Sequence, residues 1–270
     1  MTTTEGGARA LLIDITRCIG CRSCVAACKE IHGFPGDPFE AADLSANAYT
    51  VIQQKGELYV RRLCMHCVHP SCASVCPVGA LRKSPEGPVT YDAGRCLGCR
   101  YCMVACPFGV PRYQWDRPVP AVAKCDMCAG RQAEGKPPAC VEACGAEAVL
   151  SGTRDELLAE ARRRMAQAPG AYFAHVYGET EAGGTSVLFL SPVPFASLGF
   201  PQGLGEAPLP DLTRQALEKV PGIVTLGGAV LLGLWWINRR RTEVALAEAA
   251  EARGARREKH REEEEEVPYA

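Results

Sequence analysis

The sequence predicts an α+β fold in which two nested, repeated units are followed by a single C-terminal membrane-spanning helix. Two observations predict it. All 16 cysteines of the 270-residue chain fall into four quartets of similar spacing. Near the C-terminus, residues 220–237 form a run of eighteen residues without a charge.

The quartet in residues 96–107, CLGCRYCMVACP, has the pattern C-x2-C-x2-C-x3-C-P. Three thiolates on so tight a loop can converge on three irons of one cubane cluster, and Gly98 lets the backbone pass close to it. In two-cluster ferredoxins the fourth cysteine of this pattern binds the other cluster. The spacing therefore predicts a ferredoxin-like unit with paired [4Fe-4S] clusters.

The other quartets supply the partner motifs, and no cysteine is left over. We therefore expect four [4Fe-4S] clusters with all sixteen cysteines as iron ligands. The quartets are Cys18, Cys21, Cys24 and Cys28; Cys64, Cys67, Cys72 and Cys76; Cys96, Cys99, Cys102 and Cys106; and Cys125, Cys128, Cys140 and Cys144.

Because the middle quartets are nested inside the outer ones, we expect crossed ligation, in which each cluster takes one cysteine from a second quartet. The expected sets are Cys96, Cys99 and Cys102 with Cys76; Cys64, Cys67 and Cys72 with Cys106; Cys18, Cys21 and Cys24 with Cys144; and Cys125, Cys128 and Cys140 with Cys28.

Disulfides and zinc sites are two other uses of cysteine. Disulfides are typical of small secreted scaffolds, and no cleavable secretory signal opens this chain. Zinc sites also use C-x2-C pairs, but they have no need of a third cysteine and a fourth followed by proline. The spacing favours iron and sulfur over both.

The remaining pattern divides the chain into four parts: a four-cluster domain at 1–150, a helix and extended arm at 151–219, a transmembrane helix at 220–238 and a charged cytoplasmic tail at 239–270. Thr153 and Glu156 form a predicted capping box that starts an amphipathic helix. Its basic face at 162–164 is expected to be solvated, with a contact to a partner subunit as the alternative. We expect the arm to lie on the surface, and the tail to be a frayed helix followed by disorder. Strands are expected at 10–15, 49–53, 57–61, 89–91, 148–150 and 186–190.

The uncharged run spans about 27 Å as a helix, close to the hydrocarbon thickness of a bilayer. Trp235 and Trp236 stand where an interfacial aromatic belt is expected, and three arginines follow at 239–241. The positive-inside rule then places the C-terminus in the cytoplasm and the cluster domain on the periplasmic or extracellular side. Without a signal of its own, the domain would be exported together with a partner.

No catalytic constellation accompanies the quartets, so we expect an electron carrier rather than a catalyst. The formal charge of −1 and the absence of a basic patch argue against nucleic-acid binding. His66 and His69 are candidates for hydrogen bonds near a cluster or for plain surface positions. Arg22, Arg100 and Lys124 adjoin cluster ligands and would raise reduction potentials.

The quartets, the sequence at 99–111, the stretches at 176–179 and 183–195 and the C-terminal helix together resemble the iron–sulfur β subunit of membrane-bound respiratory formate dehydrogenases. The iron–sulfur subunit of hydrogenase-2-type nickel–iron hydrogenases is closely similar. Dimethyl sulfoxide, nitrate and polysulfide reductases share the cysteine pattern, and many of them lack the helix. Gly145 departs from the proline usual after the last cysteine.

The resemblance implies a position between two partners in a respiratory chain. A catalytic subunit, with a molybdenum or tungsten pterin or with nickel and iron, would supply electrons. An integral membrane cytochrome b or other quinone-binding subunit would receive them. The missing export signal favours the formate dehydrogenase type over the hydrogenase type, and a non-redox metal scaffold is the remaining alternative.

Overall fold

The computed structural model describes residues 7–117 and 120–265, which fall into two compact units, Met1–Leu212 and Thr213–Ala270. The mixed α and β structure with one apolar C-terminal helix confirms the expected fold class. The strands are β1 (Arg9–Asp14), β2 (Val51–Lys55), β3 (Leu58–Arg62), β4 (Leu81–Lys83), β5 (Val89–Tyr91), β6 (Arg112–Tyr113), β7 (Val122–Ala123), β8 (Val149–Thr153) and β9 (Val187–Leu190). The helices are α1 (Ser23–His32), α2 (Ser71–Ser74), α3 (Tyr101–Ala105), α4 (Ala129–Ala133), α5 (Ala139–Glu142), α6 (Arg154–Gln167), α7 (Leu209–Leu217) and α8 (Val220–Glu265), with 3-10 turns η1 (Ala93–Arg95), η2 (Glu181–Gly183) and η3 (Phe195–Leu198).

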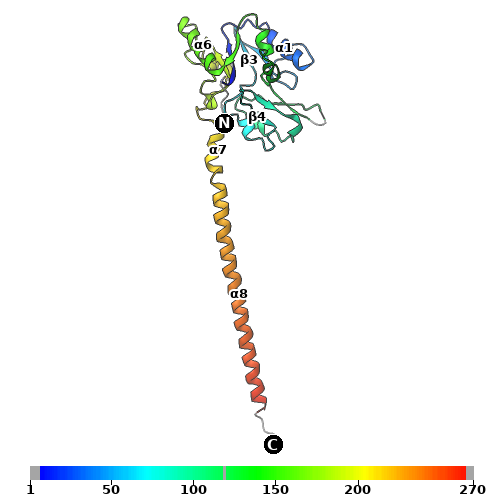
Figure 1. Cartoon of the computed structure of the whole chain (residues 1–270), viewed down its shortest axis with the longest axis vertical. Coiled ribbons are helices and arrows are strands. Elements are labelled where there is room, and N and C mark those ends of the chain that lie inside the picture. The colour runs from blue at the N-terminus through cyan, green and yellow to red at the C-terminus, as the bar shows by residue number, and fades with distance from the viewer. Residues whose placement is uncertain (1–6, 118–119, 266–270) are drawn as a thin grey trace. The chain divides into compact units, whose positions relative to one another are not determined.

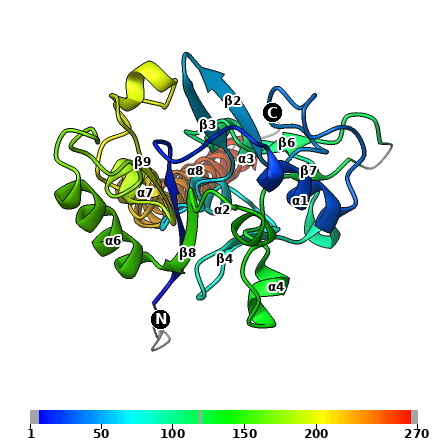
Figure 2. The same ribbon diagram turned by 90° about the horizontal axis from the view of Figure 1, so that it is seen from above.

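The first unit is organised around β1, which lies between β8 and β9 in a three-stranded sheet. β1 runs antiparallel to β8 and parallel to β9, with Leu12 opposite both Leu150 and Leu188. Both faces of the strand are buried, so its residues are apolar in succession rather than alternating. Leu12 packs with Leu157 and Leu158 of α6, while Leu11 and Ile13 belong to the main core. Figure 2 shows α6 beside β8 and β9.

Helix α6 begins as predicted, because Thr153 and Glu156 form the capping box. Its basic face differs from the expectation. Arg164 is only 11% exposed and donates to the fully buried Asp14 carboxylate at 2.8 Å, whereas the Arg162 and Arg163 side chains are exposed. The sequence pattern could not show this pair, because Asp14 lies 150 positions away.

The segment after α6 was expected to be an arm on the surface, and that expectation is wrong for residues 176–200. Strand β9 is buried along its whole length. In the main core, the ring of Phe200 packs edge to face with those of Tyr177, Phe189 and Phe195. Glycines and prolines suggested an extended chain, and the chain is indeed irregular here. Its aromatic side chains nevertheless point inward and complete the core beside the cysteine loops.

Short hairpins connect the cysteine loops, as a repeated ferredoxin-like unit requires. The pair β2–β3 lies within two residues of its predicted bounds, and β4–β5 and β6–β7 follow as further antiparallel pairs. Helix α1 packs against α5, and α2 packs against α3. The first and last quartets therefore meet, as do the two middle ones.

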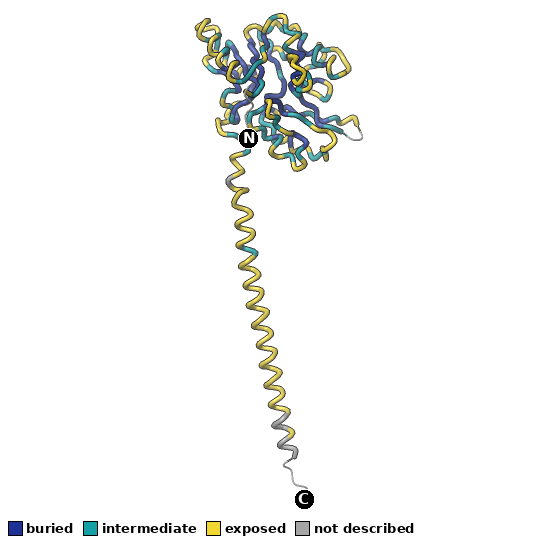
Figure 3. Tube along the Cα trace, viewed as in Figure 1, coloured by how far each residue is buried: buried dark blue, intermediate teal, exposed yellow. Residues whose placement is uncertain are grey.

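The second unit is dominated by α8, a continuous helix of 46 residues (Figure 1). It is the one helix, among the described residues, that is long and apolar enough to cross a membrane, with a mean hydropathy of 1.8 over its most apolar window. Its apolar side chains are exposed (Figure 3). The charged tail was expected to be a frayed helix, but α8 continues through it to Glu265. Within the tail, Arg239 Nε and Glu243 Oε1 lie 3.0 Å apart and form an ion pair one turn apart on the helix.

Candidate iron–sulfur centres

The sixteen thiols are all free and gather in four groups. Two groups line cavities of their own. One cavity is lined by Cys18, Cys21, Cys24 and Cys144, here called group 1. Another is lined by Cys96, Cys99, Cys102 and Cys76, here called group 4. In each, three cysteines come from one loop and the fourth from a distant quartet, which is the crossed arrangement that the nesting predicted.

In the other two groups, the thiols lie close enough together to raise one another's pKa. In group 3 (Cys64, Cys67, Cys72 and Cys106), burial raises the pKa of Cys67, and the charges of the other three thiols raise it further. In group 2 (Cys125, Cys128, Cys140 and Cys28), burial raises the pKa of Cys28 to about 12, with contributions from Cys140 and Cys128. These groups also combine three cysteines of one quartet with one of another.

The loops reach this geometry through backbone conformations that few residues tolerate. Gly20 and Gly98 occupy equivalent positions with φ of 71° and 76°. A Cβ on Gly98 would stand 2.6 Å from the Tyr113 hydroxyl, so only glycine fits. Arg22 and Arg100, two residues further on, also have positive φ and precede α1 and α3. The same backbone motif is therefore built twice.

Most of these thiols favour the protonated form until a metal binds. Burial raises the pKa of Cys72 to about 12 and that of Cys102 to about 11. A buried thiol with a raised pKa is a poor nucleophile, and it becomes a thiolate when a cation takes the place of its proton. Cys76 behaves differently: burial raises its pKa, but backbone N–H groups from Leu81 and Ala80 outweigh this and lower it. Such N–H donors stabilise ligating thiolates.

The four groups lie in a series, because a thiol of each packs in the same cluster of buried residues as a thiol of the next: Cys24 with Cys140, Cys125 with Cys64, and Cys72 with Cys102. Burial raises the pKa of Cys24, and the group 2 thiol Cys140 raises it further. Burial also raises the pKa of Cys125, with a contribution from Cys64 of group 3. The pKa of Cys72 is raised by burial and, among other thiols, by Cys102 of group 4. The order along the series is therefore group 1, group 2, group 3, group 4.

Two orphaned donors test whether these cavities fit anionic clusters. Among the described residues, Arg61 Nη1 and His66 Nε2 are the buried side-chain nitrogens without a hydrogen-bond partner. His66 Nδ1 accepts from the Val89 N–H at 2.9 Å, so the ring proton is on Nε2. His66 lies next to Cys67 and Arg61 lines the group 1 cavity. Both orphans are donors, so cysteine sulfurs and sulfides of an iron–sulfur cluster would supply the missing acceptors.

Buried or partly buried cations accompany groups 1 to 3. Lys124 is 5% exposed and its charge lowers the pKa of Cys72, although burial raises that pKa more. Lys83 donates to the His66 carbonyl at 3.1 Å, and burial lowers its pKa to about 8. Lys124 was expected near a cluster, while Arg61 and Lys83 were missed. Two adjacent charged residues, Arg61 and Arg62, lie between Val60 and Leu63 and were the available signal for Arg61.

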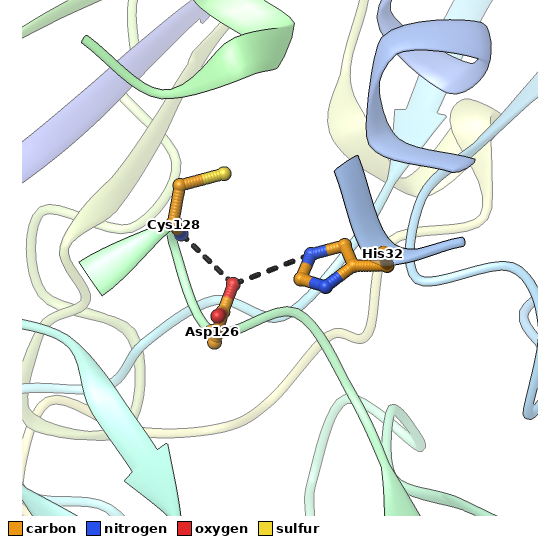
Figure 4. Close-up of side chains that lie close together, drawn as sticks. All are labelled: His32, Asp126 and Cys128. Carbon is orange, nitrogen blue, oxygen red and sulfur yellow. Dashed lines mark hydrogen bonds and ion pairs between the residues drawn. The ribbon is translucent and has the colours of Figure 1, made fainter. Parts of the chain in front are cut away.

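His66 is fully buried, which excludes a surface position for it, whereas His69 is exposed. A further histidine, His32, lies near Asp126 and Cys128 (Figure 4). One potential metal-ligand atom from each of the three residues lies within 4.8 Å of the other two. Cys128 belongs to group 2, and the Asp126 carboxylate accepts its backbone N–H at 2.8 Å. Because Cys128 has a φ of 51°, this contact stabilises the cysteine loop, and we assign no separate metal site here.

Comparison with known proteins agrees with this chemistry. Two models of 4Fe-4S dicluster domains match the chain, one at residues 17–81 and the other at residues 56–154. Together they cover all four groups. This match favours iron–sulfur clusters over zinc, and it confirms the expected kind of cofactor and repeated ferredoxin-like architecture.

Relatives cover most of the chain. A protein of Nitratidesulfovibrio vulgaris strain Hildenborough is 43% identical over 258 residues, which cover 90% of this chain and 70% of that protein. The hydrogenase-2 operon protein HybA of Escherichia coli O157:H7 is 38% identical over a match that covers 88% of this chain and 86% of HybA. The iron–sulfur subunit of nitrate-inducible formate dehydrogenase of Escherichia coli K12 is 37% identical, with 67% of each chain covered. The chain belongs to the family of 4Fe-4S electron-transfer proteins that includes HybA and this formate dehydrogenase subunit.

Proposed function

We propose that the chain is the electron-transfer subunit of a membrane-bound oxidoreductase complex and that its sixteen cysteines bind four [4Fe-4S] clusters. The serial order of the four thiol groups is the observation that carries this proposal. A bound [4Fe-4S] cluster accepts or gives one electron at a time. The loops hold four such thiol groups in a row, and each of the two middle groups has two buried thiols: Cys125 and Cys140 in group 2, and Cys64 and Cys72 in group 3.

The two ends of the series are open to solvent. Cys21 of group 1 is an exposed thiol. At group 4, Leu97 and Tyr101 are 58% and 60% exposed beside the ligating loop. Groups with exposed edges at opposite ends of the series suit a protein that receives electrons from one partner and passes them to another.

The type of catalytic partner is the finer question. The match to HybA covers 86% of that relative, against 67% for the formate dehydrogenase subunit. This longer match supports a nickel–iron hydrogenase partner. The expected preference for a molybdenum or tungsten formate dehydrogenase has no comparable support, and it is the second candidate because that subunit also belongs to the family. In either complex, a quinone-reducing membrane subunit is the proposed electron acceptor.

Residues 220–238 are the proposed membrane anchor, with the C-terminus in the cytoplasm. The support is the apolar window of α8 followed by three arginines at 239–241. Alkaline phosphatase fused after Ala270 should be inactive, whereas green fluorescent protein at the same position should fluoresce. The opposite pattern would reverse the orientation.

The function is tested by gentle solubilisation of membranes under anaerobic conditions, purification of the tagged full-length protein and metal analysis. About sixteen irons per chain are expected, four for each cubane cluster. Co-purified nickel would identify the hydrogenase type, and molybdenum or tungsten the formate dehydrogenase type. Zinc without iron would replace the electron-transfer function with a metal scaffold.

A further inference from the structure

Among the described residues, Arg61 is the most deeply buried cation near the thiol groups, and no carboxylate partner is found for it there. Arg61 is only 2% exposed. Nε donates to the Thr50 hydroxyl at 2.9 Å, while Nη1 has no partner. A buried, unpaired guanidinium is costly in a protein interior, so such a residue calls for a compensating negative charge.

The guanidinium lies between group 1 and group 2. Arg61 lines the cavity of group 1 together with all four of its thiols. Burial lowers the pKa of Arg61, but the charges of Cys140 of group 2 and Cys24 of group 1 raise it more, and these two thiols pack in one cluster of buried residues. The positive charge of Arg61 in turn acts to lower the pKa of Cys18 and Cys24 in group 1 and of Cys28 in group 2, although burial raises all three.

Strand pairing places the side chain there. In the β2–β3 hairpin, Arg61 is opposite Ile52, which also lines the group 1 cavity. The next residue, Arg62, is opposite Val51 and points to the other face of the strand, where its charge acts on Tyr177. Two adjacent arginines therefore carry the same charge into different surroundings.

We propose that Arg61 is a positioning residue for electron transfer: its fixed charge, shared between the clusters of groups 1 and 2, makes both easier to reduce and keeps them matched in potential. This inference rests on the proposed function. Reduction adds one electron to a cluster, breaks no bond and makes the site more negative by one charge. A buried cation next to two such sites favours the reduced form of each, and low local polarity strengthens the effect.

The test is a redox titration of the full-length protein in detergent, with dithionite as reductant and the clusters followed by electron paramagnetic resonance. Signals of groups 1 and 2 are assigned by their loss in Cys21→Ser and Cys128→Ser variants. In Arg61→Met, the ratio of oxidised to reduced cluster at a fixed potential should rise at least tenfold for groups 1 and 2. For a one-electron couple this equals a fall of about 59 mV in midpoint potential.

Arg62→Met is the matched control, because it removes the same charge from the other face of the same strand. Its four potentials should stay close to those of the unmodified protein. Arg61→Lys keeps the charge without the planar guanidinium, and its midpoint potentials should return most of the way to those of the unmodified protein. Groups 3 and 4 should change little in all three variants.

Several results would overturn the inference. One is an unchanged potential in Arg61→Met with all four clusters retained, and another is an equal shift of all four clusters. Selective loss of iron from groups 1 and 2 in Arg61→Met, with its return in Arg61→Lys, would support the inference. Iron loss in Arg61→Lys as well would assign the residue to packing and overturn the inference.

Absence of four clusters from the unmodified protein would instead contradict the proposed function.

Discussion

The two compact units of this chain satisfy their apolar and charged residues in opposite ways. In the first unit, Leu12, Val187 and Leu188 are fully buried, and charged residues such as Asp14 and Arg61 lie inside it. In α8, Leu231 and Leu232 are each 68% exposed. The charges of that helix pair with neighbours one turn away, as Arg239 does with Glu243.

The difference shows which interactions each unit depends on. α8 satisfies its backbone through local hydrogen bonds, and its apolar surface requires an environment such as a lipid bilayer. The first unit depends on contacts between residues far apart in sequence and on groups that can accept hydrogen bonds from its buried donors. The predictions below separate these two kinds of dependence.

Removal of iron should have the largest effect. Oxidation and chelation should abolish the cooperative thermal transition of the first unit, because four sets of buried thiols lose the ion that links distant loops. The α-helical circular dichroism of α8 should remain in detergent. Near-ultraviolet and far-ultraviolet circular dichroism measure the two effects separately. A sharp, unchanged transition in the iron-free protein would show that the polypeptide core alone holds the unit together.

Asp14→Ala should be the most damaging single substitution outside the cysteine loops. The fully buried carboxylate accepts from Arg164 at 2.8 Å and from the Tyr172 hydroxyl at 3.0 Å. Its loss leaves two partly buried donors without this acceptor, at a cost of about 1–3 kcal/mol for each, although Arg164 keeps its second partner, Glu160. Thermal loss of the visible cluster absorption measures this. Glu147→Ala, which removes the exposed partner of Arg17, is the control and should change the melting temperature little. Equal effects of the two substitutions would contradict the importance of burial.

Leu231→Arg tests the second unit. A charge near the middle of a transmembrane helix costs about 2.5–3.5 kcal/mol on insertion, so the proportion of chain in the membrane fraction should fall. Leu246→Arg has a similarly exposed position on the same helix but lies beyond the apolar run, and it should remain membrane-bound. Carbonate extraction followed by immunoblotting measures both. Full retention of Leu231→Arg would mean that partners, rather than α8, hold the subunit.

Thr153→Ala should have the smallest effect of the four. It removes the capping box at the start of α6 and should cost about 1 kcal/mol, because a backbone N–H of the first turn loses its acceptor. Thr153→Ser keeps the hydroxyl and should melt close to the unmodified protein. If both variants lose the same stability, the methyl group rather than the cap is responsible.

The cysteine spacing, the capping box and the apolar run were readable from the sequence because each depends on residues close together in the chain. The spacing C-x2-C-x2-C-x3-C reflects the reach of a single loop around a cluster, and eighteen uncharged residues reflect the thickness of a bilayer. Nesting of the quartets also indicated the crossed grouping of thiols, which Cys144 in the group 1 cavity and Cys76 in the group 4 cavity now show.

Tertiary structure decided what depends on distant partners. The irregular chain around β9 is core rather than surface because β1 and its neighbours bury it, and Arg164 is paired because Asp14 lies beneath it. The position of Arg61 between two thiol groups required the folded hairpin to meet loops from both ends of the four-quartet region. Local spacing specifies which atoms can bind a cluster, but only long-range packing determines which charges surround it, since those charges come from residues with no fixed separation in the sequence.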